Sequence, residues 1–321
     1  FVVGSAFRWT QALVAVCAAV ALIPLAWSRR SLVMRSPVVW CIALATGLTL
    51  LQLLPLPDFV MHALQPVGSS LRDSGAALAH TSPWRSLSLD PASTLRDLCF
   101  FVILLATAIV ALRFTVSERG RYRVLAVVAG VCGLVAFVVW IHQLVGADSL
   151  YGLYTPEQAH ASVLGPLLNE NHLGCLMAMG AMLALGLTMY ARQRTWWRSI
   201  WLGITALCSA TAVASESRGA TLALIAGLLL TGGMLIAQRF FGKDRSKSRR
   251  SFATTSLPLT IIASCAMIVV VYVSAGGVSE QLERTDFSQI DRPLSKVSIW
   301  MSTFTLIEES PWIGVGRGAF E

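Results

Sequence analysis

The sequence predicts an all-α protein, a polytopic bundle of transmembrane helices. Hydrophobic residues make up 55% of its 321 residues and charged residues only 13%, whereas about a quarter of the residues in soluble domains are charged. Eight apolar runs approach the length of about 20 residues that a bilayer-spanning helix needs. The charges in the segments between these runs follow the positive-inside rule.

None of the eight apolar runs has a charge near its middle. The two runs beside Arg218 are each slightly short, so a single re-entrant element is the alternative there. We favour two spans because the combined run is far too long for one crossing. The chain is thus expected to form a single membrane domain, residues 1–321, with spans at 8–27, 37–56, 95–112, 124–145, 172–190, 199–215, 219–237 and 254–273.

The orientation follows from the charges of the connecting segments. Placing the loops after spans one, three, five and seven in the cytoplasm puts 16 of the 25 basic residues there, but only two of the 17 acids, Glu118 and Asp244. The net charge of +8 is therefore an orientation signal. Nucleic-acid binding is not expected, because the basic groups are scattered over four short loops. The seven cysteines have no metal-ligand spacing and are predicted to be buried in the apolar runs.

Three longer segments, 57–94, 146–171 and 274–321, fall on the extracytoplasmic side. In the first, Ser93 or Thr94 is predicted to cap a helix that begins near Leu95, in what is otherwise a structured connector. In the second, Asn169, Asn171 and His172 are expected to cluster at the top of the fifth span. Their amides and imidazole could bind a sugar or a phosphate, and the alternative is helix capping with a solvated histidine.

The third segment contains an amphipathic pattern at 294–307, which predicts a helix in the outer membrane interface before a tight turn at 311–316. Arg292 and Lys296 lie at its start. They are candidates for binding an anion, and the alternative is a solvated face paired with acids.

Arg218 is the most informative residue, because an ionised guanidinium at the edge of hydrocarbon indicates a functional site. Its planar fork suits a phosphate, Gly219 lets a ligand approach the backbone, and a helix that begins here presents N–H groups to an anion. We expect a cationic cluster at the outer membrane surface formed by Arg218, Arg292, Lys296 and Arg317. No cofactor and no metal are expected, because the chain has no nucleotide-binding or metal-site motif and no paired carboxylates.

Four passages taken together carry a resemblance to a known family. They are Ser86-Leu87-Ser88-Leu89-Asp90-Pro91 with Thr94, then Asn169-Glu170-Asn171-His172, then Ser217-Arg218-Gly219-Ala220, and finally the stretch from Lys296 and Trp300 through Pro311-Trp312-Ile313-Gly314-Val315-Gly316 to Phe320. In this order, and on one side of the membrane, they resemble the O-antigen ligase and O-antigen polymerase superfamily of bacterial envelope proteins over nearly the whole chain.

The resemblance implies a multi-pass glycosyltransferase of the bacterial inner membrane that needs no metal. Such an enzyme moves a glycan from undecaprenyl diphosphate to lipid A-core, another repeat unit or a protein at the periplasmic face. By the family pattern Arg218 holds the diphosphate. The second basic position is usually Arg but here is Lys296, with Arg292 one turn earlier. The family's general-base His would follow beyond Glu321, so the chain is expected to be a fragment, cut at both ends and inactive alone.

Two rival functions remain open. A secondary transporter usually has ionisable groups at the midplane on broken helices, whereas the predicted helix centres lack charge and show no internal symmetry. A membrane sensor or scaffold would give no reason for an outer arginine cluster. The sequence does not distinguish a ligase from a polymerase.

Overall fold

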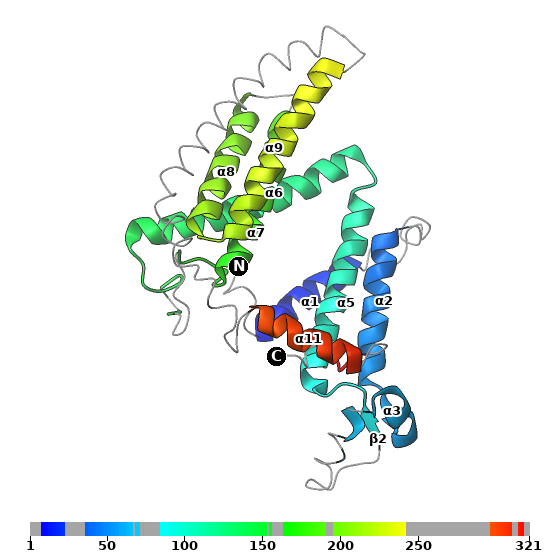
Figure 1. Ribbon diagram of the computed structural model, residues 1–321. Helices are drawn as coiled ribbons and strands as arrows, with labels where there is room; N and C mark the ends of the chain where they lie inside the picture. The colour runs from blue at the N-terminus through cyan, green and yellow to red at the C-terminus, as the bar shows by residue number, and fades with distance from the viewer. Residues whose placement is uncertain are drawn as a thin grey trace. The chain divides into compact units, whose positions relative to one another are not determined.

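The computed structural model of the protein describes residues 8–22, 36–66, 68–70, 73, 84–152, 154–155, 163–190, 195–241, 296–309 and 314–317. These residues are mostly helical (Figure 1). The helices are α1 (Arg8–Leu22), α2 (Pro37–Leu53), α3 (Asp58–Leu64), α5 (Pro91–Phe114), α6 (Glu118–Val145), α7 (Glu170–Tyr190), α8 (Thr195–Ala214), α9 (Arg218–Phe241) and α11 (Lys296–Glu309), and two short strands are β1 (Pro55–Pro57) and β2 (Trp84–Ser86).

The chain divides into two compact units. The first unit comprises Phe1–Gln11 and Thr115–Thr285, and the second unit comprises Ala12–Phe114 and Asp286–Glu321. In the first unit α7 packs against α6, α8 and α9, and α8 and α9 run side by side (Figure 1). Its core consists of small and apolar side chains of these four helices, among them Cys132, Val139, Met177, Ala212 and Leu224.

In the second unit α2 packs against α5. Strands β1 and β2 pair antiparallel, with Pro55 opposite Ser86, which adds a small sheet that the all-α prediction did not include. The sheet ties the segment after α2 to the segment before α5. It thereby fixes the loop that leads into α5.

Helix α5 begins earlier than the sequence suggested. It starts at Pro91 rather than near Leu95, and the cap is Asp90, not Ser93 or Thr94. Asp90 Oδ1 accepts hydrogen bonds from the backbone N–H groups of Ala92 and Ser93, at 3.0 and 3.1 Å. The capping prediction was wrong because it overlooked Pro91, whose fixed φ and missing N–H suit the first helical position directly after an Asp cap.

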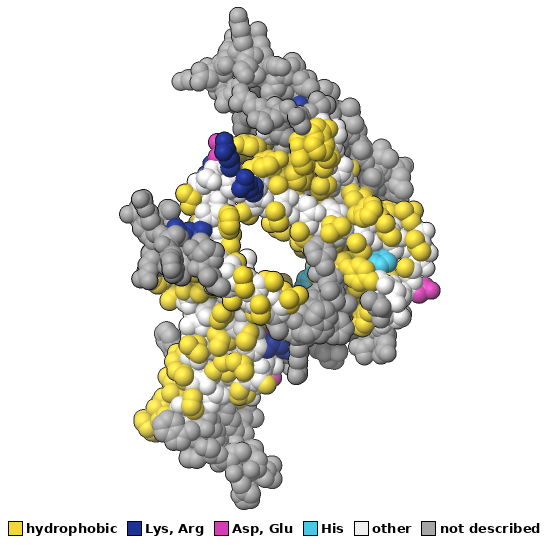
Figure 2. All heavy atoms as spheres, turned by 180° about the vertical axis from the view of Figure 1, so that it is seen from behind, with side chains coloured by type: hydrophobic (Ala, Val, Ile, Leu, Met, Phe, Trp, Pro, Cys, Tyr) yellow, Lys and Arg dark blue, Asp and Glu magenta, His cyan; other side chains and the backbone are white. Residues whose placement is uncertain are grey.

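In the part of the chain that the structure describes, three helices, α5, α6 and α7, are long and apolar enough to cross a membrane. Helix α2 and residues Arg218–Met234 of α9 are shorter apolar helices. Hydrophobic side chains cover much of the described surface in Figure 2, as a membrane-embedded protein requires. A membrane location is therefore supported. The full set of eight spans stays a prediction, and the eighth, 254–273, lies outside the described residues.

Helix α11 occupies the range in which the apolar spacing predicted a helix. Its exposed side chains include Trp300, Met301 and Phe304. Such a surface is compatible with the predicted position in a membrane interface, which stays a prediction.

Candidate functional site

The connection between α8 and α9, residues 215–220, is here named the arginine turn. Glu216 adopts a left-handed backbone conformation with φ of 56°, which is uncommon for a residue other than glycine. Ser215 is buried, and its hydroxyl donates to the Ala212 carbonyl at 2.8 Å. The chain then enters α9 at Arg218, so this residue lies at the positive end of the helix dipole.

Ser217 joins the arginine turn to the start of α7. Its hydroxyl oxygen accepts the Ala220 N–H at 3.4 Å, and its own proton goes to Asn171 Oδ1 at 2.9 Å. One buried hydroxyl therefore both caps α9 and links two motifs that lie 46 positions apart in the sequence. The sequence predicted each motif separately, without this contact.

The start of α7 is capped by Asn169, whose Oδ1 accepts the N–H groups of Asn171 and His172 at 3.0 and 3.2 Å. The helix-capping alternative therefore holds for Asn169. The side chain of His172 is exposed. Substrate contacts by Asn169, Asn171 and His172 stay predictions.

The arginine turn is tightly packed on one side and open on the other. A Cβ atom on Gly174 of α7 would lie 2.5 Å from Ser215 Oγ and 2.7 Å from Ala220 Cβ, so glycine permits the close approach of α7 to the turn. A Cβ atom on Gly219 would have no atom within 4 Å. Arg218 and Gly219 are both exposed. The described residues therefore leave this side of the turn open.

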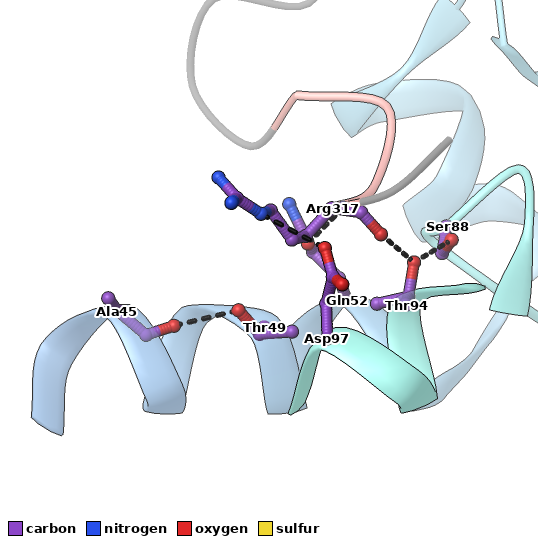
Figure 3. A network of polar contacts seen from close by, with 7 residues as sticks. All are labelled: Ala45, Thr49, Gln52, Ser88, Thr94, Asp97 and Arg317. Atoms are coloured by element: carbon purple, nitrogen blue, oxygen red, sulfur yellow. Dashed lines mark hydrogen bonds and ion pairs between the residues drawn. The ribbon is translucent and has the colours of Figure 1, made fainter. Parts of the chain in front are cut away.

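A second polar network lies in the second unit, where residues 314–317 are held against α2, α5 and the loop between β2 and α5 (Figure 3). We call this network the C-terminal clamp. The Arg317 N–H donates to Gln52 Oε1 at 3.0 Å, and Thr94 Oγ1 donates to the Arg317 carbonyl at 2.6 Å. The Leu89 N–H donates to the Val315 carbonyl at 2.9 Å. The clamp thus unites the first and fourth family motifs.

The side chain of Arg317 is also engaged in the clamp. Its Nε lies 3.1 Å from Asp97 Oδ2, and its guanidinium carbon lies 5.4 Å from the centre of the Phe101 ring. The Arg317 side chain is 63% exposed, so the ion pair contributes at most about 1 kcal/mol. The backbone bonds, rather than this ion pair, are the main anchor. A substrate contact by Arg317 stays a prediction.

Three residues that the sequence reasoning missed have the composition of a hydrolytic triad. Ser69 Oγ lies 2.9 Å from His62 Nδ1, and Asp73 Oδ2 lies 3.3 Å from His62 Nε2. However, Ser69 is only 4% exposed, and it donates its single proton to the Pro66 carbonyl at 2.7 Å. His62 Nδ1 must then donate to Ser69 rather than act as its base. The arrangement is structural, and no motif in the sequence signals it.

The remaining predicted anion ligands are not brought together by the described contacts. Arg292 lies outside the described residues, and Lys296 is the first residue of α11, with a side chain that is not described. Arg218 belongs to the first unit, whereas Lys296 and Arg317 belong to the second. The cationic cluster therefore stays a prediction. Within the described ranges, no three His, Cys, Asp or Glu residues group as metal ligands.

One comparison with known proteins finds a similarity. Residues 203–321 match the family model described as O-antigen ligase. This part of the chain, a little over a third of its length, is similar to the O-antigen ligase family. The resemblance to the O-antigen ligase and polymerase superfamily is therefore confirmed for residues 203–321. No curated protein and no solved structure matches the chain.

The arginine turn and the C-terminal clamp each lie partly inside the region that matches the family model, residues 203–321. The region includes Arg218 and residues 314–317 of the C-terminal clamp but begins after Asn171 and Thr94. Each network therefore bonds one motif inside the family region to one motif outside it. An O-antigen ligase domain indicates glycan transfer in lipopolysaccharide biosynthesis, and together with the apolar helices it supports a membrane protein.

Proposed function

We propose that this protein transfers a glycan from undecaprenyl diphosphate to an acceptor at the periplasmic face of the bacterial inner membrane, without a metal ion. The acceptor is lipid A-core, another glycan repeat unit or a protein. Arg218 binds the diphosphate, with Arg292 and Lys296 as further cationic ligands. The observation that carries this proposal is the geometry of the arginine turn within the O-antigen ligase region.

The arginine turn has three properties that favour a diphosphate ligand. Arg218 is exposed at the first position of a 24-residue helix, where the helix dipole attracts negative charge. The guanidinium can bind phosphate oxygens with two parallel hydrogen bonds. Gly219 beside it leaves the outer side of the turn open. A cation in this position stabilises the charge that develops on the diphosphate leaving group as the glycosidic bond breaks.

The apolar helices explain why a lipid-linked donor suits the site. Both helices that flank the turn are apolar, and the turn lies where they meet. A polyprenyl tail can stay in the bilayer while its diphosphate reaches the helix ends. A soluble sugar nucleotide would gain nothing from this arrangement.

The proposal is tested by substituting Arg218 in the complete protein that contains this chain, reconstituted with a lipid-linked glycan donor and an acceptor. We expect Arg218→Ala to lower the transfer rate about a hundredfold or more, because it removes a charged hydrogen-bond donor from the transition state. Arg218→Lys should recover only part of the rate, since Lys lacks the planar fork. Arg119→Ala, at an exposed arginine in the first turn of α6, is the matched control and should keep the rate.

Transfer at the normal rate by Arg218→Ala would contradict the proposal. Uptake of a labelled solute into proteoliposomes, without any glycan transfer, would instead favour a secondary transporter. Alanine at Arg292 or Lys296 should lower the rate less than alanine at Arg218, because each is expected to share the diphosphate with another cation.

A further inference from the structure

The end of the first unit that lies away from the arginine turn gathers aromatic side chains from three helices. The Tyr122 and Tyr190 rings are 5.9 Å apart, and the Tyr190 hydroxyl donates to Glu118. On α8, the Trp197 ring stacks on Trp201 with centroids 6.3 Å apart. Trp201 belongs to one buried cluster with Ala129 of α6 and Leu187 of α7. The start of α6, the end of α7 and the start of α8 therefore meet in one place, here named the aromatic end.

Two N–H donors at the aromatic end are buried without an acceptor among the described residues. Trp201 is only 5% exposed, and its Nε1 is a buried donor with no hydrogen-bond partner among the described residues. The same holds for Nε of Arg198. Residues three positions apart are neighbours on a helix surface, so the two donors lie on one side of α8. Buried donors are nearly always paired with an acceptor. These two donors therefore indicate an acceptor atom that is not among the described residues.

The charge at the aromatic end identifies the kind of acceptor. Arg119, Arg121 and Arg123 are exposed in the first two turns of α6, and Arg198 adds a fourth cation. Among the described residues of the aromatic end, Glu118 is acidic, and it accepts a hydrogen bond from the Tyr190 hydroxyl. The sequence has two more arginines, at 192 and 194, between α7 and α8. The acceptor should therefore be an anion.

The exposed indoles identify where this anion comes from. Trp196 is 50% exposed and Trp197 is 41% exposed, and their rings are 4.3 Å apart. Indoles are enriched at membrane–water interfaces, where lipid head groups lie. In the topology that the sequence predicts, this end faces the cytoplasmic leaflet, which attracts arginines through its anionic lipids.

We propose that the aromatic end binds the phosphate of an anionic phospholipid. The phosphate oxygens accept hydrogen bonds from Arg198 Nε and Trp201 Nε1, and the acyl chains lie along the exposed Trp196 and Trp197 rings. This site is separate from the arginine turn and does not depend on the proposed glycan transfer.

The test uses the purified complete protein and native mass spectrometry after exchange into mixtures of phosphatidylglycerol and phosphatidylcholine. We expect the wild-type protein to retain phosphatidylglycerol selectively. Trp201→Phe keeps an aromatic ring but loses the N–H, and it should weaken phosphatidylglycerol binding about tenfold, as should Arg198→Gln. Arg113→Gln, which removes the same charge at the end of α5 in the second unit, is the matched control and should weaken binding no more than about threefold.

Three outcomes would overturn the proposal. One is equal retention of the two lipids by the wild-type protein. A second is unchanged selectivity in both Trp201→Phe and Arg198→Gln, which would mean that another part of the chain satisfies these donors. The third is loss of the lipid on addition of millimolar inorganic phosphate with a matching rise in melting temperature, which would identify a site for free phosphate. Thermal unfolding of each variant verifies that it is folded.

Discussion

The arginine turn and the C-terminal clamp each join two distant sequence motifs, but they use their arginines differently. In the turn, hydrogen bonds converge on Ser217, and the Arg218 side chain is left exposed at the helix start. In the clamp, the backbone of Arg317 is bonded at both its N–H and its carbonyl. The first arrangement presents an arginine to a ligand, whereas the second uses the backbone of an arginine to hold the chain.

This difference separates an effect on stability from an effect on glycan transfer, which the sequence does not distinguish. A change in the clamp should mainly alter the stability of the second unit. A change in the turn should alter glycan transfer out of proportion to stability. Replacing glycine by alanine at one closely packed glycine in each region tests this distinction with the same chemical change.

The largest loss of stability is expected for Gly316→Ala. Gly316 has φ of 111°, and an added Cβ would lie 2.8 Å from the Ser88 Cα atom, which is backbone and cannot move aside. We expect a loss of about 2–4 kcal/mol in the free energy of unfolding, from strain and overpacking together. Thermal unfolding measures the change. Gly47→Ala on α2, where an added Cβ meets nothing within 4 Å, is the control and should be neutral or stabilising.

A smaller loss of stability but a larger loss of transfer is expected for Gly174→Ala. The added Cβ would push Ser215 and Ala220 away from α7 and displace Arg218 with them. The free energy of unfolding should fall by about 1–3 kcal/mol, and the transfer rate should fall more steeply than it does in Gly316→Ala. Gly186→Ala, on the same helix with no atom within 4 Å, should preserve both quantities. Equal transfer rates in Gly174→Ala and Gly186→Ala would remove the functional distinction between the two networks.

The sequence predicted the helices and motif residues of the arginine turn and the C-terminal clamp better than the hydrogen bonds between them. Apolar periodicity and loop charge depend on short stretches of chain, so a helical membrane protein could be predicted from them. Asn171 and Ser217 were identified as motif residues for the same reason. Their hydrogen bond depends on how closely α7 approaches the turn, which Gly174 permits. A glycine within an apolar run does not reveal which neighbour it allows to approach.

The clamp was missed for a related reason. Arg317 was predicted to contact substrate because of its charge, but the structure holds it by its backbone, through Gln52 and Thr94. Backbone bonds to a distant segment leave no compositional signal. Gln52 lies within a predicted span, and nothing in its neighbourhood indicated that its amide oxygen would accept a bond from residue 317.

The smallest effect should come from acid titration of Asp90, which caps α5 beside the clamp. Hydrogen bonds from the side chain and the backbone N–H of Ser93 lower the pKa of Asp90 below its ordinary value of 3.8. The folded state binds this proton more weakly than the unfolded state does. The cap therefore stabilises the protein above the unfolded pKa, and this contribution is lost as the pH falls through the folded pKa.

Asp90→Asn keeps a capping oxygen but cannot titrate, so it separates the cap from its charge. The melting temperatures of the wild-type protein and Asp90→Asn should converge as the pH is lowered from about 6 to about 3, because only the wild-type cap loses its charge. Ser93→Ala should weaken this pH dependence, since it removes the largest cause of the lowered pKa. A difference in melting temperature that stays constant over this range would mean that the charge of Asp90 does not contribute. The loop that receives the clamp would then depend on the strand pairing and backbone hydrogen bonds alone.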